Sequence, residues 1–221
     1  MLNIITMEKI IVKIQDDERC FLTKTLVCNE ISIQPTEIES YYYKKGVFED
    51  ESVHQNELQT NKHKNHFYIH RWGTKQSDSY KGGNRVSLDF VVSDDADTYY
   101  SFLIRSAIIN GEPPVVGPNK VFRKIKEVCH LDEKGLESLP IKLVPNKYDC
   151  DVLFSKRINL TKGFIDYNLR AVLCDDNFKS SRYPLKEKMV IDFITQNNMP
   201  QDIAMEYAKD KLGYIPSSIK K

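Results

Sequence analysis

The chain has 221 residues, of which 41% are hydrophobic and 10% aromatic, enough to bury a full core in one domain. Its 32 basic and 31 acidic side chains nearly cancel, so affinity for a polyanion would have to come from local clusters rather than from bulk charge. Five cysteines without a CxxC pair argue against a disulfide framework and a zinc knuckle, and they indicate a reducing compartment, taken here as the cytoplasm.

The first segment, MLNIITMEKIIVKI, lacks the basic region and the small-residue cleavage site of a signal peptide. Its alternating Ile, Val and Lys residues predict a first strand at Ile10–Ile14. No stretch of the chain reaches the roughly 18 apolar residues of a membrane span, so we expect no membrane partner.

Alternation of apolar and polar residues continues through the middle of the chain and predicts a central sheet. The further predicted strands are Glu30–Tyr43, His66–Trp72, Arg85–Val92 and Tyr99–Asn110. The polar segments Gly46–Lys64 and Gly73–Asn84 are expected to be surface loops.

Apolar residues recur at helical spacing near the C-terminus. One stripe includes Leu185, Met189 and Phe193, and a second follows Pro200 and ends at Gly213. We therefore predict two helices that cap the sheet.

The predicted strand that contains EIESYYY has residues suited to a catalytic or binding site. Side chains alternate along a strand, so Glu37, Glu39, Tyr41 and Tyr43 would project from one face. A carboxylate beside an aromatic ring suits a site that stacks a flat ring and activates a water molecule. A sheet face of packed tyrosines and solvated glutamates is the alternative interpretation of this segment.

Three further segments follow in order: FLIRSAIINGEP at 102–113, GPNKVFRKI at 117–125 and RINLTKGFIDYNLRAVL at 157–173. With EIESY at 37–41 they resemble the alkyladenine (3-methyladenine) DNA glycosylase family, in which a Glu-x-Glu-x-Tyr strand, a histidine, a Leu-Ile-Arg-Ala strand and a Gly-Pro-x-Lys-Leu turn occur in sequence. The resemblance implies an α+β fold, a single mixed domain with a curved, mainly antiparallel β-sheet and flanking helices. We assign residues 1–180 to this domain and residues 181–221 to a C-terminal helical extension packed on it.

The resemblance also implies a monofunctional DNA glycosylase of base-excision repair, which flips a modified base out of DNA and hydrolyses its N-glycosidic bond. Glu39 matches the general base of the family, and Arg105 matches the arginine that orders the attacking water and the carboxylate. Tyr41 matches the aromatic wall that stacks on the flipped base, and His54 matches the histidine that contacts it. The implied partner is DNA that contains a modified base, and we expect a monomer with neither metal nor organic cofactor.

Arg105 also has a physical reason to lie at a charged site. Its guanidinium lies among apolar neighbours and needs a carboxylate or phosphate partner to offset desolvation, for which Glu39 is the obvious candidate. A purely structural ion pair would satisfy the same requirement. Asp89 occupies a strand position where the family has asparagine. It is expected either to read a different modified base or to place a second carboxylate near Glu39.

Contacts with DNA are expected from aromatic and basic residues around the site. Trp72, at a strand end, and Tyr80, in a basic loop, are candidates for filling the gap left by the flipped nucleotide, with a preference for Trp72. Lys81 and Lys120 are candidates for phosphate contacts, together with other cations between residues 62 and 85. Solvated loop lysines are the ordinary alternative.

Two other functions remain open. The fold could be a nucleic-acid or nucleotide binding module in which Glu39 does not activate water, which Asp89 and the low net charge favour. It could also hydrolyse free nucleosides or single strands, which would make an intercalating residue unnecessary. The sequence has no GxxxxGK[ST], HExxH or GxSxG motif and no cysteine and histidine spacing suited to zinc.

Overall fold

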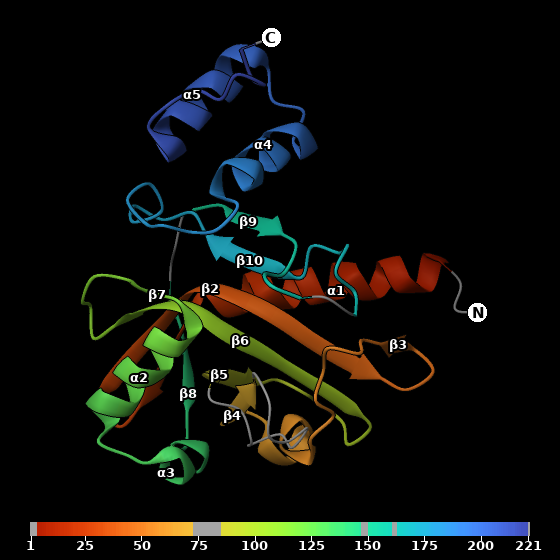
Figure 1. The fold of residues 1–221 in the computed structure, drawn as a ribbon, viewed down its shortest axis with the longest axis vertical. Coiled ribbons are helices and arrows are strands. Elements are labelled where there is room, and N and C mark those ends of the chain that lie inside the picture. The colour runs from red at the N-terminus through yellow and green to blue at the C-terminus, as the bar shows by residue number, and fades with distance from the viewer. Residues whose placement is uncertain (1–3, 73–84, 147–149, 161–162, 221) are drawn as a thin grey trace.

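The computed structural model describes residues 4–72, 85–146, 150–160 and 163–220, except for the side chains of residues 4–6 and of Trp72. The helices of these ranges are α1 (Ile4–Leu22), α2 (Pro118–Cys129), α3 (Glu133–Glu137), α4 (Lys186–Gln196) and α5 (Gln201–Leu212). The strands are β1 (Lys24–Cys28), β2 (Ile31–Lys44), β3 (Phe48–Glu49), β4 (Phe67–Trp72), β5 (Arg85–Val91), β6 (Thr98–Ile109), β7 (Val115–Val116), β8 (Lys142–Pro145), β9 (Val152–Ser155) and β10 (Arg170–Leu173). The strand pairings found in the described ranges are all antiparallel, which confirms the predicted mixed α+β fold with a mainly antiparallel sheet (Figure 1).

The sheet is organised around its longest strands, β2 and β6. Its order is β4-β5-β6-β2-β1-β8, with β10 on the same side of β2 as β1 and β9 paired to β10 (Figure 1). The strands β2, β4, β5 and β6 lie where the alternating pattern predicts them, and α4 and α5 match the two predicted C-terminal helices. The prediction of a strand at Ile10–Ile14 is wrong, because these residues belong to α1.

The helix α1 forms because its apolar residues follow helical spacing. Ile14, Phe21 and Leu22 are buried in the main core, and Met7 and Ile10 pack against it, which places them on one stripe of the helix. Glu18 occupies the same stripe and is also buried. A charged residue thus occupies a core position of the apolar stripe.

The two faces of the sheet differ in chemistry. Core side chains such as Ile38, Phe102 and Phe90 occupy one face, where residues of α1 and α2 join the same apolar cluster. A row of cross-strand partners, Arg170, Glu39, Leu103, Asp89 and Tyr68, runs over β10, β2, β6, β5 and β4. Directly paired residues project from the same face, so this row places the polar side chains of the site together.

Two irregularities interrupt the pairing of β2 with β6. Thr36 on β2 and Arg105 on β6 have no paired residue, while Pro35 pairs with Ala107 and Ile38 pairs with Ile104. An extra residue in a strand is a β-bulge, which bends the chain locally and redirects a side chain. The two bulges compensate, so the register before them equals the register after them.

The C-terminal helices α4 and α5 form a second apolar cluster with the outer strands. Met189 and Val190 of α4 and Ala204 of α5 are buried together with Leu153 of β9 and Val172 of β10. This cluster fixes the helices to the β9–β10 end of the sheet (Figure 1). None of the helices in the described ranges has the length and apolar character that a bilayer crossing requires.

The buried Glu18 predicts an unusual pH dependence of stability. Burial raises the pKa of this carboxyl to about 8, although Ser40 Oγ donates a hydrogen bond to Oε1 at 2.6 Å. A carboxyl with a raised folded-state pKa contributes most stability below its unfolded value of 4.5 and loses that contribution as the pH rises to about 8. We expect this group to lower the free energy of unfolding by about 1.4 kcal/mol per pH unit in this window.

Urea denaturation of wild type and Glu18→Gln at closely spaced pH values between 5 and 9 measures this slope. The substitution should flatten the decline, because glutamine does not titrate. Parallel pH curves for the two proteins would contradict the assignment to Glu18.

Candidate active site

A cavity of about 350 Å³ opens on the polar face of the sheet. Its volume lies within the usual range of small-molecule sites. The cavity combines charged, aromatic and apolar walls, and its lining residues are Glu39, Tyr41, Ser52, His54, His70, Arg85, Leu103, Arg105, Pro118, Ile158, Asn159 and Leu160. Four residues predicted from the sequence therefore border one space, namely Glu39, Tyr41, His54 and Arg105.

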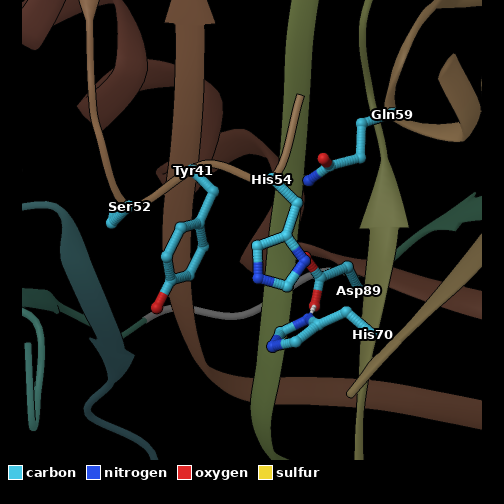
Figure 2. Close-up of a pocket in the computed structure, with 6 residues that line it drawn as sticks. All are labelled: Tyr41, Ser52, His54, Gln59, His70 and Asp89. Atoms are coloured by element: carbon cyan, nitrogen blue, oxygen red, sulfur yellow. Dashed lines mark hydrogen bonds and ion pairs between the residues drawn. The ribbon is translucent and has the colours of Figure 1, made fainter. Parts of the chain in front are cut away.

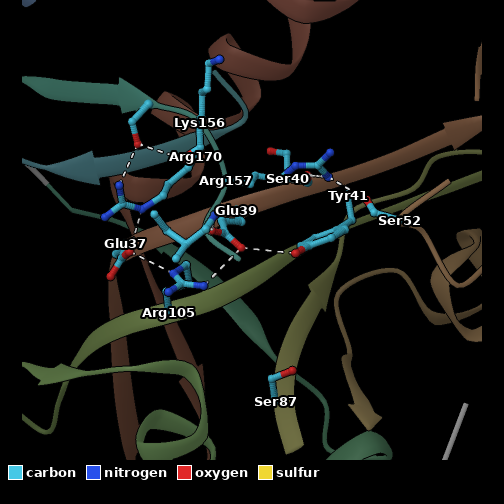
Figure 3. A network of polar contacts seen from close by, with 12 residues as sticks. Glu37, Glu39, Ser40, Tyr41, Ser52, Ser87, Arg105, Lys156, Arg157 and Arg170 are labelled. Carbon is cyan, nitrogen blue, oxygen red and sulfur yellow. Dashed lines mark hydrogen bonds and ion pairs between the residues drawn. The ribbon is translucent and has the colours of Figure 1, made fainter. Parts of the chain in front are cut away.

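Glu39 is the best-supported side chain of the cavity wall. Its Oε1 accepts a hydrogen bond of 2.7 Å from the backbone N–H of Ile158. Its Oε2 accepts a bond of 3.2 Å from the Tyr41 hydroxyl and lies 3.3 Å from Nη1 of Arg105 (Figure 3). The predicted pairing of Arg105 with Glu39 is thus present, and both glutamates of the strand share a face with Tyr41.

The protonation of this group follows from its burial. Burial raises the pKa of the Glu39 carboxyl, while Arg105 and the Ile158 N–H favour the charged form. Glu37, rather than Asp89, is the neighbouring carboxylate that adds to the rise. Burial and then Glu39 raise the pKa of Tyr41 well above its ordinary value, so its hydroxyl stays protonated and donates.

Glu37 has a different environment from Glu39. Its Oε1 accepts hydrogen bonds from Nε of Arg105 at 3.0 Å and from Nε of Arg170 at 2.8 Å (Figure 3). Arg170 is fully buried and also donates to Ser155 Oγ at 2.7 Å. Glu37 is therefore a structural counter-ion that holds Arg105 in place beside Glu39.

The loop after β9 closes one side of the cavity and is held by a buried ion pair. Arg157 Nη1 lies 2.7 Å from Asp50 Oδ2, and both side chains are fully buried. The Arg157 guanidinium lies 4.9 Å from the ring centroid of Tyr41, so it covers the ring from one side. At Gly163, where φ is +79°, a Cβ atom would lie 2.2 Å from Asp50 Oδ1, so this close approach requires glycine.

A second polar cluster involves His70, which the sequence search did not select. His70 Nδ1 lies 3.1 Å from Asp89 Oδ1, and Ser101 Oγ donates to Asp89 Oδ2 at 2.9 Å. The His54 and His70 rings meet edge to face at 5.0 Å. A small adjoining pocket is lined by Tyr41, Ser52, His54, Gln59, His70 and Asp89 (Figure 2). Of these two spaces, Asp89 lines the adjoining pocket, and His70 lines both.

The predicted DNA contacts are only partly described. Tyr80, Lys81 and the side chain of Trp72 lie outside the described residues. Lys120 is exposed on the first turn of α2, so the predicted Gly-Pro turn in fact starts a helix whose residue Pro118 borders the cavity.

Other cations of the expected cluster already have carboxylate partners. Lys62 pairs with Glu57 at 3.1 Å, and Lys64 and Arg71 pair with Asp94 and Glu133. The pairs of the two lysines are exposed, and exposed pairs are weak enough to exchange for phosphate contacts.

Within the described ranges, no group of three or more His, Cys, Asp or Glu side chains is arranged to hold a metal ion. No protein-family model matches the chain, and no curated protein is significantly similar to it. Any functional proposal therefore depends on the motifs of the sequence and on the geometry of the cavity.

Proposed function

We propose that this protein is a DNA glycosylase that hydrolyses the N-glycosidic bond of a flipped, modified base with Glu39 as the general base. The observation that supports this most is the position of Glu39 on a cavity of about 350 Å³, bonded to Arg105, Tyr41 and the Ile158 N–H. Such a cavity has room for a nucleobase, and the charged wall lies beside aromatic and apolar walls suited to a flat ring.

The chemistry assigned to each residue follows from its contacts. The Glu39 carboxylate takes a proton from a water molecule that attacks C1′, and its raised pKa makes it a stronger base than an exposed glutamate. Arg105 stabilises the carboxylate and, held by Glu37, is positioned to orient the water. Tyr41 presents its ring to the cavity, with Arg157 behind it.

One observation favours the alternative of a catalytically altered nucleic-acid or nucleotide binding module. Glu39 is 0% exposed: the Tyr41 hydroxyl and the Arg105 guanidinium contact its Oε2, and the Ile158 N–H donates to its Oε1. A water molecule can reach the carboxylate only if one of these partners shifts. In a binding module the same cluster would serve to hold the cavity wall in shape.

An abasic-site assay separates these functions. The wild-type protein is incubated with duplex and single-stranded oligonucleotides that carry single modified bases, and strand cleavage after alkali treatment reports abasic sites. Accumulation of abasic sites supports the glycosylase. Oligonucleotides that are bound but remain intact support the binding module, and neither binding nor excision would reject both.

The raised pKa of Glu39 predicts an acid limb in the rate of excision. The charged carboxylate is the active form, so protonation removes the base as the pH falls through the raised pKa. In single-turnover measurements between pH 5 and 9, the rate should therefore begin to fall at a higher pH than it would with an ordinary glutamate, whose pKa is 4.5. A rate that stays constant down to pH 5 in protein shown by circular dichroism to be folded would contradict this assignment.

A further inference from the structure

His70 and Asp89 form a charged pair at the cavity wall. The His70 side chain is 13% exposed and that of Asp89 only 2%, so the histidine reaches the cavity while the carboxylate lies behind it. Asp89 is fixed on both oxygens, by His70 Nδ1 and by Ser101 Oγ, and Gln59 Nε2 donates in turn to Ser101 Oγ at 3.2 Å. This arrangement holds the imidazole in one orientation.

The second ring nitrogen, Nε2, does not contact Asp89, and the Ser87 hydroxyl lies near both ring nitrogens, 3.3 Å from Nδ1. Figure 2 shows this nitrogen directed away from Asp89, toward the side of the pocket where Tyr41 lies. Ser87 Oγ lies 3.0 Å from Nε2 and gives it a polar partner, which a substrate nitrogen would share or displace. A carboxylate on Nδ1 orients the ring, so that Nε2 can donate a proton to a substrate atom.

One strand lies between Glu39 and Asp89, and two strands lie between Glu39 and His70. Glu39 of β2 and Asp89 of β5 both pair with Leu103 of β6, so their backbones lie roughly 10 Å apart, at two strand spacings. His70 lies on β4, beyond Asp89. A nucleoside in the cavity would therefore have Glu39 on one side and His70 on the other, which is the placement that an acid and a base need around a scissile bond.

We propose that His70, positioned by Asp89, is the general acid of the reaction. This inference rests on the proposed glycosylase function. Water attacks C1′ and loses a proton to Glu39, the C1′–N bond breaks with its electron pair moving to the base, and His70 Nε2 transfers its proton to a nitrogen of that base. Solvent then returns a proton to His70, and Glu39 releases one.

The charge of the leaving base decides whether such an acid is needed. A base that carries a positive charge through alkylation leaves as a neutral molecule and gains little from protonation. An uncharged base, such as a deaminated purine, would leave as an anion unless it is protonated. General acids of this kind typically contribute ~10²- to 10⁴-fold to the rate.

Single-turnover excision from two oligonucleotides tests the proposal, one with uncharged hypoxanthine and one with cationic 7-methylguanine. His70→Gln should reduce excision of hypoxanthine by about 10²-fold or more while changing excision of 7-methylguanine by less than about threefold. Asp89→Asn should shift the same ratio in the same direction by a smaller factor. His66→Gln, four residues earlier and with its Nδ1 on the Lys64 carbonyl, is the matched control and should leave both rates unchanged.

The outcomes are distinguishable. An equal loss on both substrates would assign His70 a structural role and overturn the proposal, as would unchanged rates in His70→Gln. Wild-type protein that excises only 7-methylguanine would overturn the acid role and leave the glycosylase in place. If the wild-type protein excises neither base from duplex or single-stranded DNA, the acid role is overturned. If it also excises no base from any modified oligonucleotide of the abasic-site assay, the glycosylase is rejected as well.

Discussion

Glu39→Gln should lower the rate of base excision by about two to four orders of magnitude, while affinity for the modified oligonucleotide stays within about tenfold, or about 1.4 kcal/mol. Glutamine keeps the volume of the side chain, and its one carbonyl oxygen can still accept the hydrogen bond from the Ile158 N–H, while its amide nitrogen replaces the oxygen that accepts from Tyr41. It cannot take a proton from water. Single-turnover excision and fluorescence anisotropy on the same oligonucleotide measure the two quantities.

Glu30→Gln provides the control for this experiment. Glu30 is exposed in the turn before β2, away from the cavity-lining residues, so its substitution should change neither rate nor affinity. Excision by Glu39→Gln at the wild-type rate would remove Glu39 from the chemistry. The cavity would then be better explained as a binding site.

Glu37→Gln should lower the free energy of unfolding by about 3–5 kcal/mol, the usual cost of removing one partner from a buried ion pair. Glu37 is 1% exposed and accepts hydrogen bonds from both Arg105 and Arg170. Its loss of charge removes the carboxylate paired with the buried Arg170 and leaves Arg105 paired with Glu39. Urea denaturation monitored by circular dichroism measures the change.

Glu39→Gln is the matched comparison for stability. Burial already disfavours the charged form of Glu39, so a neutral amide loses an ion pair but also avoids a desolvation cost. We expect a change of less than about 1 kcal/mol, within the range of ordinary substitutions. Equal destabilisation by the two variants would mean that Glu39 is as much a structural counter-ion as Glu37.

The alternating pattern was sufficient to predict the central strands. In β2, β4, β5 and β6, apolar and polar residues face opposite sides of the sheet, and this period of two is visible in a single sequence. The helix α1 was missed because Ile10, Val12 and Ile14 alternate as in a strand, although Val12 is exposed in the helix. The helix α2 was missed because its family resemblance suggested a turn, although Val121, Phe122 and Ile125 are buried at helical spacing.

Two kinds of site residue could be predicted from the sequence. They are residues that share one strand and residues that match a motif of the glycosylase family. Glu39 and Tyr41 are two residues apart on β2, so their shared face follows from the strand itself. The pairs His70–Asp89 and Arg157–Asp50 join separate segments. Their proximity depends on strand register and loop closure, which composition and spacing do not encode.

The paired bulges of β2 and β6 limit how this sheet can change in length. Loss of Thr36 alone would shift one half of β2 by one residue against β6 and exchange its buried and cavity-facing side chains. Loss of Thr36 and Arg105 together would keep the ladder in register and remove the arginine from the cavity wall. Single-residue insertions and deletions at these two positions should therefore be tolerated only as compensating pairs. The alignment of the two longest strands thus depends on the same bulge that places Arg105 beside Glu37 and Glu39.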